Sequence, residues 1–227
     1  MAENIIPIDL GFVNAYLVRN GERFVLVDTG LSSQWQKLTN GLAAAGCTPG
    51  KLALVILTHC DQDHAGNALR LKQEWKTPIA AHAADARTLE TGKAPKRHVR
   101  GLLLTILIGM MDLLHKAKKN VSMTPTFTPD ILLRDGQRLD AWGLDARILH
   151  LPGHTQGSIA ILTAQGSLIA GDVFSNRRRP STAPFIENIE AYRGSLAKAK
   201  ELVPQVKTVY PGHGPSFPGS AIAGIEL

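Results

Sequence analysis

Short hydrophobic runs alternate with amphipathic stretches along most of the chain. Near the N-terminus, the apolar runs 13–18 (VNAYLV) and 24–27 (FVLV) flank an Asn-Gly pair, a pattern typical of a β-hairpin. The continuous apolar run 52–58 (LALVILT) is typical of a buried strand. The other predicted strands are 78–82, 131–133, 146–151, 158–163, 167–170 and 207–210.

Helices are predicted between these strands. Ser32 or Ser33 can cap a helix that runs to about residue 45, and further helices are predicted at 65–75, 83–90 and 189–203. Strands and helices therefore alternate in two similar blocks, with polar loops where strands end. This order predicts an α/β fold in which two sheets lie between helices, within one domain over residues 1–227.

One apolar segment, 101–114 (GLLLTILIGMMDLL), interrupts this order inside an apolar and basic helical insertion at about 92–124. It is shorter than the roughly 20 apolar residues that a membrane-spanning helix needs. Three interpretations remain open: a helical lid or wall of a substrate site, a contact in a homodimer, or an anchor that lies in the membrane surface.

Composition indicates a folded protein in a reducing compartment. Hydrophobic residues make up 44% of the 227 residues, which supplies a core and excludes a disordered chain. The first ten residues, MAENIIPIDL, lack the basic and apolar regions of a secretory signal. With only Cys47 and Cys60 available for a disulfide, we expect reduced thiols and a cytoplasmic location.

The formal charge of +6 is concentrated in three basic clusters, 93–100, 115–119 and 177–179. Such clusters either form a solvated rim or attract anionic partners. Aromatic residues make up only 5% of the chain and do not alternate with basic residues as in proteins that bind single-stranded nucleic acid. We therefore expect a small-molecule substrate and no nucleic acid.

The strongest chemical signal is HCDQDH at 59–64, directly after the predicted buried strand. If alternate residues point to one side at the strand end, His59, Asp61 and Asp63 converge there, and His64 joins them where the chain turns into a helix. Such a cluster would be strongly unfavourable if buried without a cation. The pattern therefore predicts a metal site, with Cys60 pointing back into the core as a buried thiol.

Three later loops supply further candidate ligands. Each places one histidine or aspartate beside glycine at the exit of a predicted strand, where the backbone can approach closely. These residues are His154 in PGHT, Asp172 in GD and His213 in PGHG.

Taken together, these motifs resemble the metallo-β-lactamase superfamily, over nearly the whole chain from VDTG to the final GHG. The resemblance implies a four-layer αββα sandwich with two mixed sheets flanked by helices. It also implies two divalent metal ions and an outer carboxylate, Asp28, that supports the ligands. The implied ligands are His59, Asp61 and His154 for the first metal, Asp63, His64 and His213 for the second, and Asp172 between both.

The sequence departs from the family motif H-x-H-x-D-H at Asp61, where the family has histidine. Family members with a carboxylate at this position still hold two metals, so Asp61 is retained as a ligand. Two divalent ions, three aspartates and a bridging hydroxide sum to zero charge, whereas the histidine motif would leave +1. We expect zinc to be the metal, with iron or manganese as alternatives because the site is less electrophilic.

The resemblance implies hydrolysis by a metal-bridging hydroxide, with Asp63 as the catalytic residue that positions the nucleophile and transfers a proton. The chain ends 14 residues after His213, so we expect no C-terminal helical domain of the glyoxalase II type. Segments 101–114 and 177–179 are expected at the mouth of the cleft. An apolar wall and a cationic rim favour an ester, thioester or lactone. The alternatives are a β-lactam or phosphodiester substrate, or a metal-binding protein with little turnover.

Overall fold

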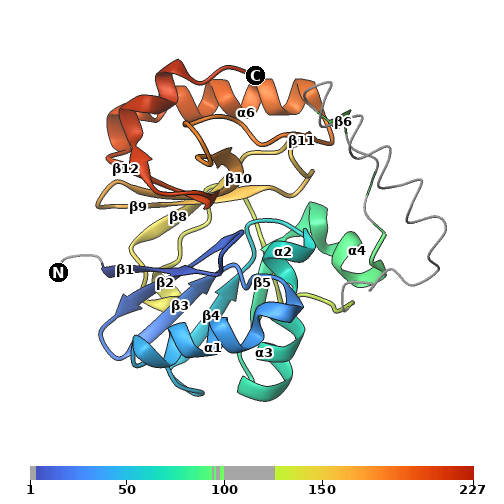
Figure 1. Cartoon of the computed structure of the whole chain (residues 1–227), viewed down its shortest axis with the longest axis vertical. Helices are drawn as coiled ribbons and strands as arrows, with labels where there is room; N and C mark the ends of the chain where they lie inside the picture. The colour runs from blue at the N-terminus through green and yellow to red at the C-terminus, as the bar shows by residue number, and fades with distance from the viewer. Residues whose placement is uncertain (1–3, 94, 96–97, 100–125) are drawn as a thin grey trace.

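A computed structural model describes residues 4–93, 95, 98–99 and 126–227 of the chain. Two β-sheets face each other, and helices cover their outer faces (Figure 1). The first sheet has the order β1-β2-β3-β4-β5-β7, with antiparallel pairs up to β3 and parallel pairs beyond it. Its strands are β1 (Asn4–Asp9), β2 (Asn14–Asn20), β3 (Arg23–Val27), β4 (Leu52–Ile56), β5 (Ile79–His82) and β7 (Ile131–Leu133).

The second sheet has the order β13-β12-β10-β9-β8, in which only β10 and β12 are parallel. Its strands are β8 (Ala146–His150), β9 (Ile159–Thr163), β10 (Ser167–Ser175), β12 (Thr208–His213) and β13 (Phe217–Pro218). A separate two-stranded ribbon joins β6 (His98–Val99) to β11 (Phe185–Ile186). Both main sheets are mixed, as expected for this fold class.

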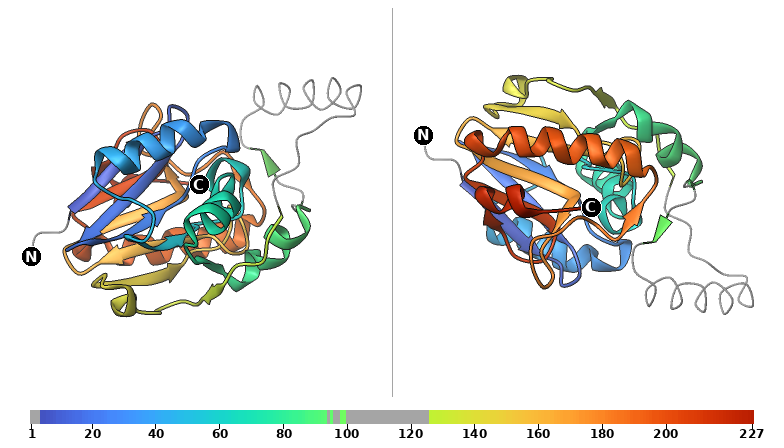
Figure 2. Two further views of the ribbon diagram at one scale, coloured as in Figure 1. Left: turned by 90° about the horizontal axis from the view of Figure 1, so that it is seen from below. Right: turned by 90° about the horizontal axis from the view of Figure 1, so that it is seen from above.

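The helices complete four layers. Helices α1 (Trp35–Ala44) and α3 (Ala68–Trp75) cover the first sheet, and α6 (Ile189–Glu201) covers the second, as the two perpendicular views in Figure 2 also show. Helix α4 (Ala83–Thr91) lies beside β5 and β7, and the short α2 (Gln62–Ala65) follows β4. The prediction of two mixed sheets between helices is confirmed.

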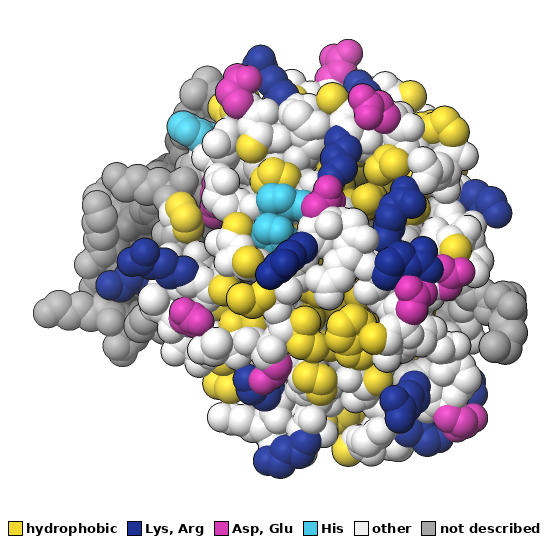
Figure 3. Space-filling view, turned by 180° about the vertical axis from the view of Figure 1, so that it is seen from behind, with side chains coloured by type: hydrophobic (Ala, Val, Ile, Leu, Met, Phe, Trp, Pro, Cys, Tyr) yellow, Lys and Arg dark blue, Asp and Glu magenta, His cyan; other side chains and the backbone are white. Residues whose placement is uncertain are grey.

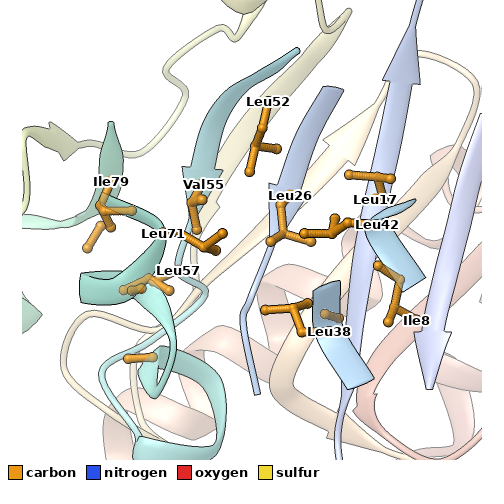
Figure 4. Packing of buried hydrophobic residues seen from close by; sticks show 14 of the residues in the cluster. Ile8, Leu17, Leu26, Leu38, Leu42, Leu52, Val55, Leu57, Leu71 and Ile79 are labelled. Carbon is orange, nitrogen blue, oxygen red and sulfur yellow. The ribbon is translucent and has the colours of Figure 1, made fainter. Parts of the chain in front are cut away.

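The hydrophobic core forms three clusters, one for each interface between layers. Leu26 on β3 packs against Leu38 and Leu42 of α1 (Figure 4), whereas its neighbours Val25 and Val27 face the second sheet. A third cluster lies between the second sheet and α6. Because successive side chains of a strand point to opposite faces, a strand buried on both faces needs a continuous apolar run. This explains why the central strands lack an alternating polar pattern.

Several element boundaries differ from the predictions. The hairpin is present as β2 and β3, whereas the edge strand β1 was not predicted. The predicted helix 65–75 is divided into α2 and α3 at Gly66 and Asn67. A Cβ atom on Gly66 would lie 2.6 Å from the backbone atoms of Gly30 and Ser32, and the Asn67 amide donates hydrogen bonds to Thr29 and Leu31. The helix is interrupted where it anchors the loop after β3.

The apolar segment 101–114 lies outside the described residues, so its three interpretations remain predictions. Within the part of the chain that the structure describes, no helix combines the length and apolarity needed to cross a bilayer. On the face shown in Figure 3, lysine and arginine side chains are scattered among acidic and hydrophobic ones.

Candidate metal centre

The HCDQDH segment reaches the site by a turn and a short helix. Strand β4 ends at Ile56, His59 lies in the following turn, and Asp61 directly precedes α2, which contains Asp63 and His64. The expectation that alternate residues of a strand end converge was therefore wrong about the mechanism. The bend before α2 and the start of this helix bring the side chains together instead: His59 and Asp61 precede the helix, and Asp63 lies within it beside His64.

The three later residues come from the second sheet. His154 lies in the loop after β8, as predicted, but Asp172 is inside β10 and His213 is the last residue of β12. Both strands are longer than predicted, and the pairing between them shifts register at Gly171. A Cβ atom on Gly171 would lie 2.4 Å from the Thr58 hydroxyl oxygen.

One half of the centre gathers around His59, Asp61 and His154. The Asp61 carboxylate oxygen Oδ2 lies 3.4 Å from His59 Nε2 and 3.1 Å from His154 Nε2. His154 Nε2 also lies 3.7 Å from Oδ2 of Asp172. His59, His154 and Asp172 are buried, and their potential ligand atoms lie within 4.8 Å of one another.

The other half gathers around Asp63, His64 and His213, whose potential ligand atoms also lie within 4.8 Å of one another. Oδ1 of Asp172 lies 3.3 Å from both His64 Nε2 and His213 Nε2. Asp63 Oδ2 lies 3.4 Å from His213 Nε2 and 3.9 Å from His64 Nε2. Asp172 thus directs one carboxylate oxygen to each half of the centre.

Two of the imidazoles are oriented by side chains. The Thr58 hydroxyl lies 2.7 Å from Asp28 Oδ2, to which it donates, so His59 Nδ1, 3.0 Å away, donates to the hydroxyl oxygen. His64 Nδ1 donates to Asp28 Oδ2 over 2.8 Å. Each ring is therefore held in the tautomer that leaves the Nε2 lone pair directed into the site.

The other two imidazoles are oriented by backbone carbonyls. His154 Nδ1 donates to the oxygen of Phe185 over 2.7 Å, and His213 Nδ1 donates to the oxygen of Phe12 over 2.6 Å. Arg177 Nη2 lies 3.0 Å from the same His213 Nδ1, but the Nδ1 proton is already directed to Phe12. All four rings therefore hold Nδ1 as a donor and turn Nε2 inward.

Buried polar atoms at the centre lack ordinary partners. Among the described residues, His59 Nε2, His64 Nε2 and Asp172 Oδ1 are buried without a hydrogen bond of acceptable geometry. Native structures leave few such atoms, because each buried unsatisfied group is costly. Imidazole nitrogens and carboxylate oxygens are ligands for zinc and related divalent ions, so the arrangement fits a pair of such ions.

The carboxylates of the centre raise the pKa values of two of its histidines. Burial alone would lower the pKa of His64, but the carboxylates of Asp28, Asp63 and Asp172 outweigh it and hold this pKa well above its usual value. Burial likewise opposes the charged form of His213, yet Asp172 and Asp63 raise its pKa to about 9. In the metal-free protein, protons on His64 and His213 therefore supply positive charge in place of the cations.

The pKa values of two further groups, Asp172 and His59, are lowered. Burial would raise the pKa of Asp172, but His64 and His213 hold this pKa well below its usual value. Burial lowers the pKa of His59 and outweighs the effect of Asp61. The aspartate that lies between the two halves is therefore ionised, and the His59 ring is neutral, at neutral pH.

Asp28 occupies the position expected for a supporting carboxylate. It lies after β3 with a positive φ of 62°, a conformation that aspartate tolerates better than most residues. Its Oδ1 accepts the Thr58 backbone N–H over 2.8 Å, while Oδ2 accepts from the Thr58 hydroxyl and from His64. Asp28 thereby joins the loop after β4 to helix α2.

A cavity of about 230 Å³ opens above the centre. Asp61, Asp63, Asp172 and His213 contribute to its walls, together with apolar and cationic groups at the rim. These other lining residues are Phe12, Ser175, Arg177, Pro184 and Phe185. The guanidinium of Arg177 stacks 4.1 Å from the ring centre of Phe12. The expected basic edge of the cleft is therefore present at Arg177.

Several residues that build the centre were not predicted from the sequence. Thr58, Phe12 and Phe185 orient imidazoles, and Asp85 binds two of the ligand-bearing loops. Phe12 and Phe185 act through backbone carbonyls, which carry no signal in the sequence. Cys60, as expected, is a buried residue of the core between the first sheet and its helices.

Known proteins with similar sequences include a thioesterase, a probable metallo-hydrolase and a beta-lactamase-like protein by name. The Acyl-coenzyme A thioesterase MBLAC2 of Homo sapiens is 26% identical over 216 residues, which cover 90% of this chain and 74% of that protein. The Probable metallo-hydrolase YqjP of Bacillus subtilis is 27% identical over 230 residues, covering 92% and 69%. The Beta-lactamase-like protein 2 homolog of Drosophila melanogaster is 25% identical, and the match covers 88% of this chain but only 58% of that relative.

Solved structures and a family model agree with these relatives. The BLEG-1 B3 metallo-beta-lactamase superposes with a TM-score of 0.72 at 21% identity, over 96% of this chain and 95% of that one. A metallo-beta-lactamase family protein of Thermus thermophilus gives 0.68 at 24% identity, over 96% and 75%. The model of the metallo-beta-lactamase superfamily matches residues 8–213, which include all seven candidate ligands. The chain belongs to the metallo-beta-lactamase superfamily and is a metal-dependent hydrolase.

Proposed function

We propose that this protein hydrolyses acyl esters and thioesters, lactones included, with two divalent metal ions. One observation carries the metal part of the proposal. Four imidazoles hold Nδ1 as a donor and converge through Nε2 on three carboxylates. Metal-ligating histidines are held in this way, since the Nδ1 hydrogen bond sets both ring orientation and tautomer.

The proposed ligands follow the two halves of the centre. The first ion is held by His59, Asp61 and His154, the second by Asp63, His64 and His213, and Asp172 lies between them. Zinc suits this mixture of nitrogen and oxygen ligands, and the extra carboxylate at Asp61 also suits iron or manganese. Asp28 supports both sets, through His64 directly and through Thr58 to His59.

The bound ions would supply acidified water as the nucleophile and polarise the attacked carbonyl. The chain's own contribution begins with Asp63, whose carboxylate borders the cavity. Burial raises its pKa, but His64 and His213 outweigh this effect and lower it, so Asp63 is ionised at neutral pH. It would take a proton from the attacking water as the water oxygen bonds to the carbonyl carbon, and pass this proton to the departing oxygen or sulfur.

The rim of the cavity supports an acyl substrate that carries a negative group. Phe12, Pro184 and Phe185 present apolar surface to the acyl part. Arg177 stacks on Phe12 and, among the residues that the structure describes, has no carboxylate within ion-pair distance. Its donors therefore remain for an anion on the substrate, and the thioesterase named among the relatives favours an acyl-coenzyme A thioester.

A substrate panel tests the proposal. Metal-loaded and chelator-treated protein would be assayed with a neutral acyl ester, an acyl-coenzyme A thioester, a lactone, nitrocefin and a phosphodiester. We expect metal-dependent turnover of the ester or thioester. Activity confined to nitrocefin or to the phosphodiester would refute the acyl substrate, and metal binding without any turnover would leave a binding protein.

Substitution of Arg177 tests whether this side chain binds the anionic group of the substrate. Arg177→Gln should raise KM for the thioester about tenfold, the loss of roughly one charge-assisted hydrogen bond, and leave KM for a neutral ester unchanged. Arg193→Gln is the matched control, because Arg193 is an exposed residue of α6 whose side chain is 65% accessible. Equal effects of Arg177→Gln on both substrates would contradict this role.

A further inference from the structure

We infer that Asp85 is the positioning residue that holds together the two loops carrying the first metal's ligands. The inference rests on the metal assignment proposed above but not on the identity of the substrate. Asp85 is in the first turn of α4 and is only 2% exposed. A buried carboxylate is unfavourable unless its oxygens are well bonded, so its partners indicate its role.

The partners of Asp85 come from both loops. Oδ2 accepts the Cys60 backbone N–H over 2.9 Å, and Cys60 lies between the proposed ligands His59 and Asp61. The same oxygen accepts the Thr155 hydroxyl over 2.8 Å, and Thr155 follows the proposed ligand His154. One carboxylate thus connects both segments that carry the first metal's ligands.

A second hydrogen bond and close packing connect Asp85 to the loop that carries His154. Oδ1 of Asp85 accepts the Gly157 backbone N–H over 2.7 Å. A Cβ atom on Gly157 would lie 2.4 Å from Asp85 Cγ, so the loop approaches the carboxylate as closely as its backbone allows. The Ser158 hydroxyl lies 2.9 Å from the Thr155 hydroxyl and 2.9 Å from the Thr155 backbone nitrogen. These contacts hold the Thr155 hydroxyl in place to donate to Asp85.

Asp85 and Asp28 support the centre in different ways. Asp28 bonds directly to the His64 ring, a proposed ligand of the second metal. Asp85 instead accepts from backbone N–H groups and a hydroxyl, and so acts through the backbone spacing of the first metal's loops. Asp28 also reaches the first metal's ligand His59 through the Thr58 hydroxyl, so its removal should affect both metals, whereas removal of Asp85 should affect the first.

The effect of Asp85→Asn follows from the donors around it. All three partners donate, so the new amide group must direct its own N–H bonds at another donor in either orientation. The loops must separate to relieve this contact, which moves His59 and Asp61 away from His154. Loss of a group that orients ligands weakens metal binding by about 10- to 100-fold, and we expect this loss at the first metal alone.

Metal affinity in two backgrounds tests the inference. Co²⁺ binding to metal-free protein would be followed by calorimetry and visible absorption. In a His213→Ala background, which retains the first metal's ligands, Asp85→Asn should weaken Co²⁺ binding by about 10- to 100-fold. In a His154→Ala background, which retains the second metal's ligands, it should change the affinity by less than about threefold.

Two further variants serve as comparisons. Asp28→Asn should weaken binding in both backgrounds, because Asp28 bonds to His64 directly and to His59 through Thr58. Asp130→Asn should be neutral in both, since Asp130 also accepts a backbone N–H, from Ile79 at 2.9 Å, but lies outside the centre. Thr155→Val removes one donor to Asp85 and should give a smaller loss in the same direction as Asp85→Asn, which keeps the test decisive if that variant fails to fold.

Equal losses in both backgrounds, or wild-type affinity in both, would overturn the role of Asp85. The metal measurement needs no substrate, so a wild type that hydrolyses no acyl ester or thioester would refute the proposed substrate and leave this result standing. A wild type that binds fewer than two ions would overturn both proposals.

Discussion

The metal-free protein should lose stability as the pH rises from 6.5 to 9. In the folded protein, Asp172 and Asp63 raise the pKa of His213 to about 9 against the effect of burial, whereas the unfolded chain restores the ordinary value near 6.5. A group whose pKa is raised by folding stabilises the fold fully below its unfolded pKa and loses that contribution as the pH passes the folded pKa. The relevant window is therefore pH 6.5 to 9.

The expected magnitude follows from this interval. At about 1.4 kcal/mol for each pH unit, His213 alone contributes about 3 kcal/mol to the free energy of unfolding. His64, whose pKa is also raised, adds to the loss in the same direction. Domains of this size are stable by only about 5–15 kcal/mol, so the change is large. The raised pKa of Cys47, about 11, affects stability only above pH 9.

Urea unfolding of chelator-treated protein at half-unit pH steps measures this effect. Metal-loaded protein is the control, because ligated imidazoles carry no proton and the decline should disappear. His213→Gln should make the decline shallower in the metal-free form and leave the part that comes from His64. A free energy of unfolding that stays level or rises between pH 6.5 and 9 in the metal-free protein would refute the charge distribution deduced for the centre.

Two substitutions probe the ligands more directly. Asp61→His should raise the charge of the metal-loaded centre by one and shift its preference towards zinc over iron and manganese, which metal analysis after growth in mixed metals would detect; an unchanged metal content would contradict this. Gly212→Ala would put a Cβ atom 2.4 Å from Asp172 Oδ1 and 2.7 Å from His64 Cε1, so it should reduce metal content and activity together. Full metal occupancy in Gly212→Ala would contradict this, because it would show that the residues of the centre move to accommodate the added methyl group.

Much of the fold could be predicted from the hydrophobic pattern alone. The hairpin, the buried strand before HCDQDH and the helices α1, α4 and α6 were located to within a few residues. These elements follow from the local spacing of apolar residues along the chain, which differs between helices and strands. Edge strand β1 and the break at Gly66 were missed, because the reason for each lies in a neighbouring segment. At the break, the His64 carbonyl accepts the backbone N–H and the hydroxyl of Thr29, which lies in the loop after β3.

The candidate ligands could also be read from the sequence, because ligand chemistry resides in side-chain type and the residues of HCDQDH are adjacent in the chain. Only the tertiary structure decided how they are held. His213 is oriented by the carbonyl of Phe12, 201 positions away, and His154 by that of Phe185, 31 positions away. Every residue has the same carbonyl, so the sequence carries no sign of these partners. Asp85 likewise resembles any helical aspartate until folding buries it between two loops.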